Sequence, residues 1–302
     1  MPPTFRAAVV TAPGTPEPVT FVDRPQTPVP PGHVRVGVEA AAVNPVDLAV
    51  VAGIFHQVGV VTQPEHTGLG WDFAGPVLEA GEGVDLAPGT VVAGFALGID
   101  RDYSAYAEQI TVPVGFVAVV PDGLSAAEAA TVPLNGLTAA QLVAKLGPGE
   151  GRDLLVTGAA GAVGAYVVPL AIEQGWNVTG LARATDEAYV RSLGAEFTTD
   201  PAAGWPVVID AAALQEKAVA LVADGGRFLG VQPSFVPAPE RGIDIGSLNV
   251  AADAAVLADL LHRTAAGRPA ARVARTLPLE RWADAHAALA AGGSRGRQVL
   301  VP

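Results

Sequence analysis

The 302-residue sequence contains no cysteine. This absence excludes disulfide bonds, cysteine nucleophiles and every metal site that needs a thiolate ligand. The zinc sites that combine Cys and His ligands are therefore excluded as well. Any catalytic chemistry has to depend on other side chains.

Charge is also scarce, because Asp, Glu, Lys and Arg make up only 16% of the chain, whereas about a quarter is usual. Half of the residues are hydrophobic, so much of the chain must be interior or interface, and we expect a homodimer. The 30 acidic residues outnumber the 18 basic ones and give a net charge of −12. We expect no nucleic-acid partner for so acidic a chain.

A targeting segment and a membrane span are two further features that the sequence does not show. Residues 1–10 lack a basic region followed by an apolar core and a cleavage site, so we predict a cytoplasmic protein. The uncharged stretch 154–172 is long enough to cross a bilayer. However, three glycines and Pro169 interrupt it, and Asp153 and Glu173 bound it, so we predict no membrane contact.

That same stretch is the most informative part of the chain. Residues 153–157 predict a buried strand, and a glycine-rich turn and a helix start follow them. Glycines let backbone amides approach a pyrophosphate closely, and the helix N-terminus favours negative charge. The turn therefore predicts a dinucleotide site made by Gly158, Ala159, Gly161, Ala162, Val163 and Gly164. Because Ala159 departs from the stricter Gly-x-Gly-x-x-Gly spacing, a strand-to-helix turn without ligand is the alternative.

The pattern of apolar and turn-forming residues changes near residue 125. From Arg6 to Val120, short apolar runs are separated by Pro and Gly, which indicates an irregular β-barrel or sandwich. Ser125 and Glu128 then form a capping box that predicts a helix. Strands and helices alternate after it, which predicts a parallel sheet with helices on both faces. The predicted strands are 153–157, 176–181, 195–199, 207–210 and 226–231, and the predicted helices are 162–174, 185–193, 213–223, 253–266 and 280–291.

Several strings, in one order along the chain, carry a resemblance to a known family. They are Ala42-Val-Asn-Pro-Val-Asp47, Gly70-Trp-Asp-Phe-Ala-Gly75, Pro133-Leu-Asn-Gly-Leu-Thr-Ala139, the glycine turn, Leu193-Gly-Ala195, Gly225-Gly-Arg227 and Gly296-Arg-Gln-Val-Leu-Val301. With these strings the chain resembles the zinc-free quinone oxidoreductase branch of the medium-chain dehydrogenase/reductase superfamily.

The resemblance implies an α/β protein with two domains. A GroES-like β-barrel catalytic domain is expected over residues 1–124. A Rossmann domain with a doubly wound parallel sheet is expected over 125–267, and the segment 268–302 returns to the catalytic domain. Members of the branch use NADPH to reduce quinones or other conjugated carbonyl compounds, so a small quinone or enone is the expected substrate.

In the zinc-dependent relatives a Cys and a His of the catalytic domain hold the metal, and here Asn44 and Trp71 stand at those places. We therefore predict an enzyme without zinc. A site built from His56, His66 and carboxylates is the alternative, but no metal-binding spacing supports it.

The resemblance also indicates candidate catalytic residues. Asn44 is the leading one, since an uncharged amide can orient a carboxamide or a carbonyl; its alternative role is to form a turn before the next helix. Thr138 is expected near the nicotinamide, or else as a plain helix-start hydroxyl. Phe55 stands where related enoyl reductases carry a proton-donating Tyr, so His56 is the substitute candidate, unless it is an exposed loop residue.

Cofactor choice is read after the second strand of the dinucleotide fold, where a basic side chain favours NADPH and an acidic one NADH. Arg183 and Thr185 stand there and predict NADPH, although Arg183 has a solvated surface charge as its alternative role. Val231 and Arg297 complete the expected cofactor-binding residues. Arg297 follows a glycine near the C-terminus, as in the family, and its alternative role is a charge before the last strand.

Two other functions stay open. One is an enoyl reductase of a biosynthetic pathway, which would act on 2-enoyl thioesters. The other is a non-catalytic protein that senses NADPH and binds the nucleotide without turnover.

Overall fold

The computed structural model describes residues 3–63 and 65–302. They form two compact units. Unit 1 contains the chain up to Leu134 together with Ala252–Ala265 and Ala270–Pro302, and unit 2 contains Asn135–Ala251 and Ala266–Pro269. The first border falls inside helix α4 (Pro133–Leu146). As borders between independently folding domains, positions 124 and 267 stay a prediction.

Unit 1 is built on two β-sheets. The larger sheet has eight strands in the order β16-β17-β4-β6-β3-β8, with β7 paired to β6 and β9, and the smaller sheet has the order β2-β1-β5. The two last strands of the chain thus join β4 from its first part, in agreement with the expected GroES-like domain. The strands are β1 (Thr4–Val10), β2 (Val19–Pro25), β3 (His33–Gly37), β4 (Ala40–Ala42), β5 (Thr67–Gly68), β6 (Asp72–Ala80), β7 (Val91–Phe95), β8 (Gln109–Pro113), β9 (Val117–Val119), β16 (Val273–Pro278) and β17 (Arg297–Val301).

The core of unit 1 is made of aromatic and branched side chains. Phe73, Phe95 and Tyr106 are its largest fully buried side chains. Strand β6 crosses this core closely enough that a Cβ on Gly75 would come 1.9 Å from the carbonyl oxygen of Gly37. Only glycine permits that approach.

Five α-helices of unit 1 connect or cover these strands: α1 (Pro45–Val51), α2 (Ile54–Gln57), α3 (Ala126–Ala129), α8 (Ala254–Ala265) and α9 (Trp282–Ala291). Short 3₁₀ turns occur at Val114–Phe116 and Leu279–Arg281. Helix α3 begins at the predicted capping box, in which the backbone amide of Ser125 donates to the Glu128 carboxylate at 2.9 Å.

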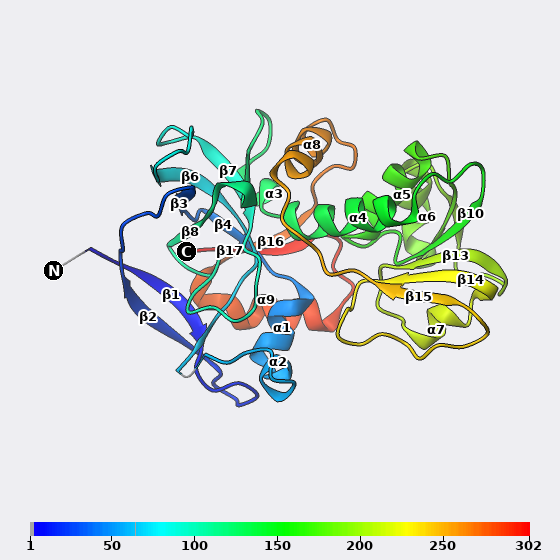
Figure 1. The fold of residues 1–302 in the computed structure, drawn as a ribbon, viewed down its shortest axis with the longest axis horizontal. Coiled ribbons are helices and arrows are strands. Elements are labelled where there is room, and N and C mark those ends of the chain that lie inside the picture. Colours follow the sequence, from blue (N-terminus) through cyan, green and yellow to red (C-terminus); the bar gives the residue numbers. More distant parts are fainter. Residues whose placement is uncertain (1–2, 64) are drawn as a thin grey trace. The chain divides into compact units, whose positions relative to one another are not determined.

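Unit 2 is a six-stranded parallel sheet in the order β12-β11-β10-β13-β14-β15. The chain runs outward from β10 in both directions, and helices α5 and α6 lie on one side of the sheet while α7 lies on the other (Figure 1). This confirms the predicted doubly wound Rossmann fold. Its elements are β10 (Asp153–Thr157), α5 (Gly164–Glu173), β11 (Asn177–Leu181), the 3₁₀ turn Ala184–Asp186, α6 (Glu187–Ser192), β12 (Glu196–Thr198), β13 (Trp205–Asp210), α7 (Glu216–Val219), β14 (Val222–Gly230) and β15 (Asp244–Ser247).

The predicted helix 213–223 is wrong in its length, because α7 spans only Glu216–Val219. Ala213 and Gln215 have φ values of 54° and 58°, which interrupt a helix, and the backbone amide of Gln215 donates to the Asp210 carboxylate instead. Strand β8 was not predicted, because its partner β3 is distant in sequence. Strand β2 was not predicted either, although it pairs with β1, its neighbour along the chain.

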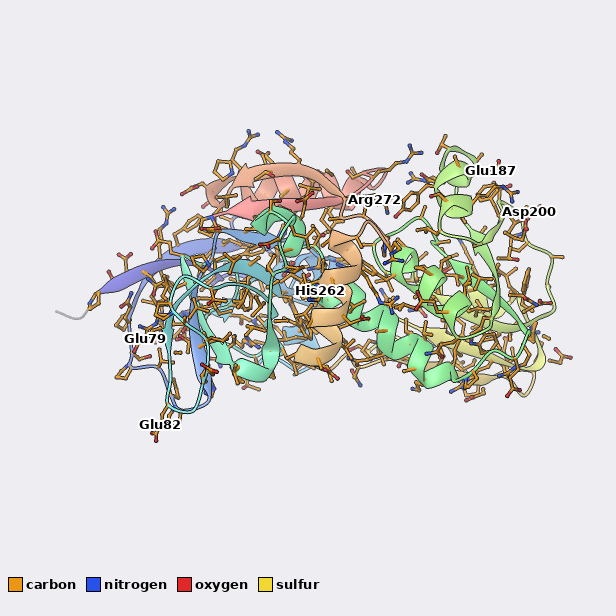
Figure 2. The ribbon with its side chains drawn as sticks, turned by 90° about the horizontal axis from the view of Figure 1, so that it is seen from above. Glu79, Glu82, Glu187, Asp200, His262 and Arg272 are labelled. Carbon is orange, nitrogen blue, oxygen red and sulfur yellow. The ribbon has the colours of Figure 1, made fainter. Side chains whose placement is uncertain are left out.

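Several of the sparse charged side chains lie at the periphery. Glu79 and Glu82 lie at the outer edge of unit 1, and Glu187 and Asp200 lie at that of unit 2 (Figure 2). No helix in the described part of the chain is both apolar enough and long enough to traverse a lipid bilayer.

Candidate active site

The glycine turn lies between β10 and α5, as predicted, and its geometry requires glycine. A Cβ on Gly164 would come 2.3 Å from the carbonyl oxygen of Gly158, and one on Gly161 would come 2.9 Å from the same atom. Gly158 has φ 60°, and its Cβ would come 2.9 Å from the Cβ of Ala212. Each substitution would therefore force the turn open.

This turn presents backbone donors. The amides of Ala162, Val163 and Gly164 have no hydrogen-bond acceptor among the described residues. Ala159, by contrast, is fully buried, and its amide donates to the carbonyl of Leu181 on β11. Unengaged amides at a helix N-terminus suit an anion. The turn thus fits the pyrophosphate of a dinucleotide, with Ala159 fixing the turn to the sheet.

A buried hydrogen-bonded pair supports the turn from the neighbouring strand. The hydroxyl of Thr157 donates to the Asp210 carboxylate at 2.6 Å, and both side chains are almost fully buried at the carboxyl ends of their strands. The second oxygen of Asp210 accepts the amide of Gln215 at 2.8 Å. Asp210 therefore holds the loop 211–215 that packs on Gly158, a role that no sequence motif indicates.

The other residues expected to bind the cofactor lie at the same edge of the sheet. Arg183 and Thr185 follow β11, and Val231 follows β14. Arg183 is 61% exposed at its side chain and pairs with the buried carboxylate of Asp186 at 3.3 Å. Its guanidinium is therefore accessible to a ligand while one end of it is fixed. Direct contact of these three residues with a cofactor stays a prediction.

Unit 1 contains a buried polar cluster around Asn44, the N-cap of α1. The amide nitrogen of its side chain donates to Asp72 at 2.9 Å and to the carbonyl of Ala42 at 3.3 Å. Its backbone amide donates to Asp47 at 2.8 Å, which closes a capping box. These contacts fit the turn-forming role left open by the sequence. A contact with nicotinamide or substrate stays a prediction.

Two carboxylates of this cluster are fully buried together with an arginine. Burial raises the pKa of Asp47 to about 7, against hydrogen bonds from Asn44, Gly70 and Tyr106 that lower it. Burial also raises the pKa of Asp72 to about 7, although its oxygens accept from Asn44 and from the amide of Leu134 at the start of α4.

Arg297 is the positive partner of this pair. Its side chain is 9% exposed, and burial lowers its pKa, while the charges of Asp72 and Asp47 act in the opposite direction. The described structure therefore gives Arg297 a second role, that of compensating two buried acids. Whether it also reaches a cofactor stays a prediction.

Tyr106 and His286 extend the cluster. The Tyr106 hydroxyl lies 3.3 Å from the Asp47 carboxylate and 3.3 Å from Nε2 of His286. Burial lowers the pKa of His286 to about 4 and raises that of Tyr106, so both are neutral near pH 7. The consistent arrangement is that His286 donates to Tyr106 and Tyr106 donates to Asp47. Neither residue belongs to a recognisable sequence motif.

The remaining predicted catalytic residues, His56 and Thr138, take no part in the hydrogen bonds described above. His56, on α2, is half-buried, with Nε2 3.3 Å from the Thr67 hydroxyl and with a buried Nδ1 that has no hydrogen-bond partner in the described chain. It is therefore not a plain exposed loop histidine. Thr138 is 7% exposed on α4. The catalytic roles of both stay predictions.

The residues present do not fit a zinc ion. Asn44 uses its amide hydrogens within the fold, and Trp71 stacks on Phe95 with ring centroids 5.6 Å apart. In residues 3–63 and 65–302, no group of three or more His, Asp or Glu side chains is arranged to hold a metal.

Comparison with known proteins agrees with this geometry. Residues 30–138 match the family model described as the alcohol dehydrogenase GroES-like domain, and residues 185–300 match that of a zinc-binding dehydrogenase. An NADPH-dependent alkenal/one oxidoreductase of Arabidopsis thaliana is 29% identical over 89% of this chain and 72% of its own length. A 2-methylene-furan-3-one reductase of Solanum lycopersicum is 32% identical over 68% of this chain and 56% of its own length.

Among solved structures, the quinone oxidoreductase of Coxiella burnetii superposes with a TM-score of 0.85 at 23% identity, covering 99% of this chain and all of that one. This likeness shows the shared fold. The two units thus define a two-domain oxidoreductase that uses a nicotinamide nucleotide. The chain belongs to the medium-chain dehydrogenase/reductase superfamily and is a quinone oxidoreductase-like enzyme.

Proposed function

We propose that the protein transfers hydride from NADPH to a quinone or to another activated carbonyl or alkene, without zinc. The glycine turn is the observation that carries the proposal, because it combines unengaged amides with positions that only glycine can occupy. The named relatives support the acceptor class, since their names specify alkenals, enones and a methylene-furanone. We further propose a homodimer in the cytoplasm.

In this proposal the chain's own residues bind the cofactor and orient the acceptor. NADPH supplies the hydride. The turn from Gly158 to Gly164 holds the pyrophosphate, and the guanidinium of Arg183 pairs with the 2′-phosphate. A quinone or enone spreads the arriving negative charge over a conjugated system, so positioning replaces a Lewis acid. His56 is the proposed proton donor, through Nε2, which lies beside the Thr67 hydroxyl.

Changing Arg183 to Ala is expected to raise the Kd of NADPH by about tenfold or more, because a charge-assisted contact with the 2′-phosphate is lost. The Kd of NADH is expected to change little. Fluorescence titration with both nucleotides measures the ratio. The matched control is Arg191→Ala on α6, whose ion pair with Glu187 is exposed. If the Kd values of NADPH and NADH rose equally, Arg183 would not bind the 2′-phosphate.

A screen of NADPH oxidation against simple quinones, 2-alkenals, enones and 2-enoyl thioesters is expected to give turnover with the quinones and enones. Stoichiometric oxidation with the thioesters alone would make the protein an enoyl reductase. Melting temperatures raised by NADPH, with no acceptor turned over, would instead identify an NADPH sensor. Metal analysis after dialysis belongs to the same experiment, since one retained zinc that activity requires would contradict the zinc-free mechanism.

A further inference from the structure

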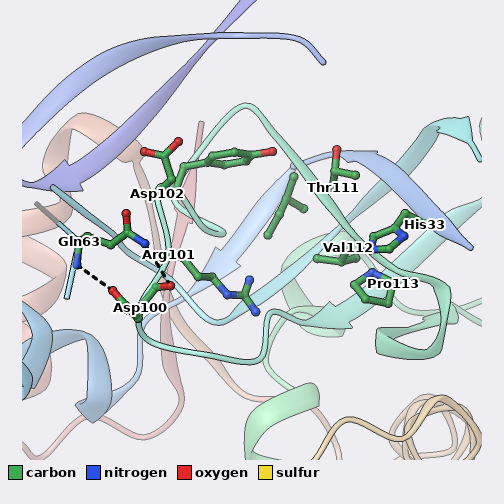
Figure 3. A pocket seen from close by; sticks show the side chains of 10 residues that line it. His33, Gln63, Asp100, Arg101, Asp102, Thr111, Val112 and Pro113 are labelled. Atoms are coloured by element: carbon green, nitrogen blue, oxygen red, sulfur yellow. Dashed lines mark hydrogen bonds between the residues drawn. The ribbon is translucent and has the colours of Figure 1, made fainter. Parts of the chain in front are cut away.

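Unit 1 contains a pocket with no assigned role. Its volume is about 320 Å³, within the lower range of small-ligand sites. The segment 100–103 forms one side of it, and strand β8 with His33 at the start of β3 forms the other (Figure 3). None of the residues expected to bind the nucleotide lines it.

Arg101 supplies the polar group of this pocket. Its side chain is half-buried, and it makes no hydrogen bond or ion pair with any described residue. Burial lowers its pKa to about 10, and only the nearby Tyr103 acts against that shift. The guanidinium still carries its full charge near pH 7. A buried positive charge without a carboxylate partner is costly, so a bound anion would stabilise it.

The two acids next to Arg101 do not serve as that partner. Asp100 accepts from the Thr62 hydroxyl at 2.6 Å and from the amides of Thr62 and Gln63 at 3.0 Å each. Asp102 pairs with Arg24, and its carboxylate lies 2.7 Å from Nε2 of His66. Figure 3 shows the carboxylate of Asp102 pointing away from the guanidinium of Arg101. Both carboxylates in the segment are therefore engaged by groups other than Arg101, Asp102 by a cation and Asp100 by neutral donors.

The backbone of Arg101 is hydrogen-bonded to a neighbouring strand. Its carbonyl accepts the amide of Gly68 on β5 at 2.8 Å. Gly98 has φ 109°, and a Cβ there would come 3.3 Å from Nε of Arg101. The missing side chain of Gly98 thus gives the arginine room to lie along the loop.

The lining determines the chemistry of the ligand. One guanidinium offers a planar fork and a single charge, which match a carboxylate better than a phosphate dianion. The opposite wall is apolar at Pro113, while Ile110 and Val112, which also line the pocket, are only 2% and 1% exposed. We propose that this site, the Arg101 pocket, binds the carboxylate of a small monocarboxylic acid whose short carbon chain lies against that wall. The proposal does not depend on the oxidoreductase function.

The test observes the arginine Nε–H resonances of the ¹⁵N-labelled protein during titration with sodium butyrate. The resonance of Arg101, identified by its loss in Arg101→Lys, is expected to shift to saturation with butyrate. It is expected not to shift with butyramide or with sodium chloride at equal ionic strength. In Arg101→Lys the affinity, followed by ligand-observed NMR, is expected to fall by about tenfold, because the fork is lost although the charge remains.

The matched control is Arg191→Lys, an exposed arginine in unit 2, which is expected to leave butyrate binding unchanged. If Arg101→Lys proves unstable, Arg101→Gln identifies the same resonance and removes both the fork and the charge. No saturable shift, or equal shifts of all arginine resonances, would contradict the proposal. A stronger response to inorganic phosphate would also overturn it. If binding occurs, competition between butyrate and an active acceptor distinguishes a substrate carboxylate from a separate effector.

Discussion

Replacing Gly164 with alanine is expected to raise the Kd of the nicotinamide nucleotide by about a hundredfold. The new Cβ would lie 2.3 Å from the carbonyl oxygen of Gly158 and 2.8 Å from the Cα of Ala159. Both are backbone atoms, so no side-chain rotation relieves the clash, and overpacking of this kind costs up to about 3 kcal/mol. The turn must open, and the amides of Ala162 and Val163 lose their common direction. Fluorescence titration with NADPH measures the effect.

Two further variants test whether the loss of NADPH binding follows the severity of the clash. Gly161→Ala, with its Cβ 2.9 Å from the same oxygen, is expected to weaken binding less than Gly164→Ala. Gly115→Ala, where nothing lies within 4 Å and φ is ordinary, is expected to change nothing. Unaltered NADPH binding in a folded Gly164→Ala protein would show that the turn does not hold the pyrophosphate. The melting temperature checks folding.

Replacing Arg297 with methionine is expected to destabilise unit 1 by about 3–5 kcal/mol at pH 8.5, because it leaves Asp47 and Asp72 charged and buried without compensation. At pH 6.5 the loss is expected to be much smaller. The pKa values of both acids, already raised to about 7 from 3.8, rise further without the arginine. The folded chain then binds protons that the unfolded chain does not, so stability increases as the pH falls below the raised values.

The interval from pH 6.5 to 8.5 isolates these two acids. His286, whose pKa is lowered to about 4 from 6.5, is neutral in the folded chain over that range. Its partial protonation in the unfolded chain at pH 6.5 is common to wild type and variant and cancels in their difference. Urea unfolding at both pH values gives the difference in free energy between wild type and variant. Arg263→Met, which removes a partly exposed helical ion pair with Asp259 on α8, is the control and is expected to cost less than about 1 kcal/mol at either pH. Equal losses at both pH values for Arg297→Met would contradict the proposed compensation.

Local patterns explain how much of the fold was predictable. The strand at 153–157, the turn and the capping box at Ser125 depend on neighbouring residues, and the structure places them as expected. The end of the predicted helix 213–223 depends on a hydrogen bond from Gln215 to Asp210, which a pattern of apolar residues does not contain. Strands such as β8 depend on partners distant in sequence, and propensity alone does not identify them.

The candidate site divides in the same way. The dinucleotide turn could be recognised in the sequence because its glycine spacing is a local requirement of the backbone. The roles of Tyr106 and His286 depend on a contact between residues far apart in the chain, and neither belongs to a motif. For Asn44 the sequence indicated the position, but its hydrogen bond to Asp72 shows that the fold itself uses the amide.

The pairing of β17 with β4 sets an order for folding during synthesis. Residues 135–251 leave the ribosome before Arg297–Val301, so most of the parallel sheet can form while unit 1 is still incomplete. Until the last strand arrives, one edge of β4 lacks its partner, and Asp47 and Asp72 lack their cation. Nascent chains stalled before residue 297 are therefore expected to expose an unpaired, aggregation-prone sheet edge and to depend on chaperones.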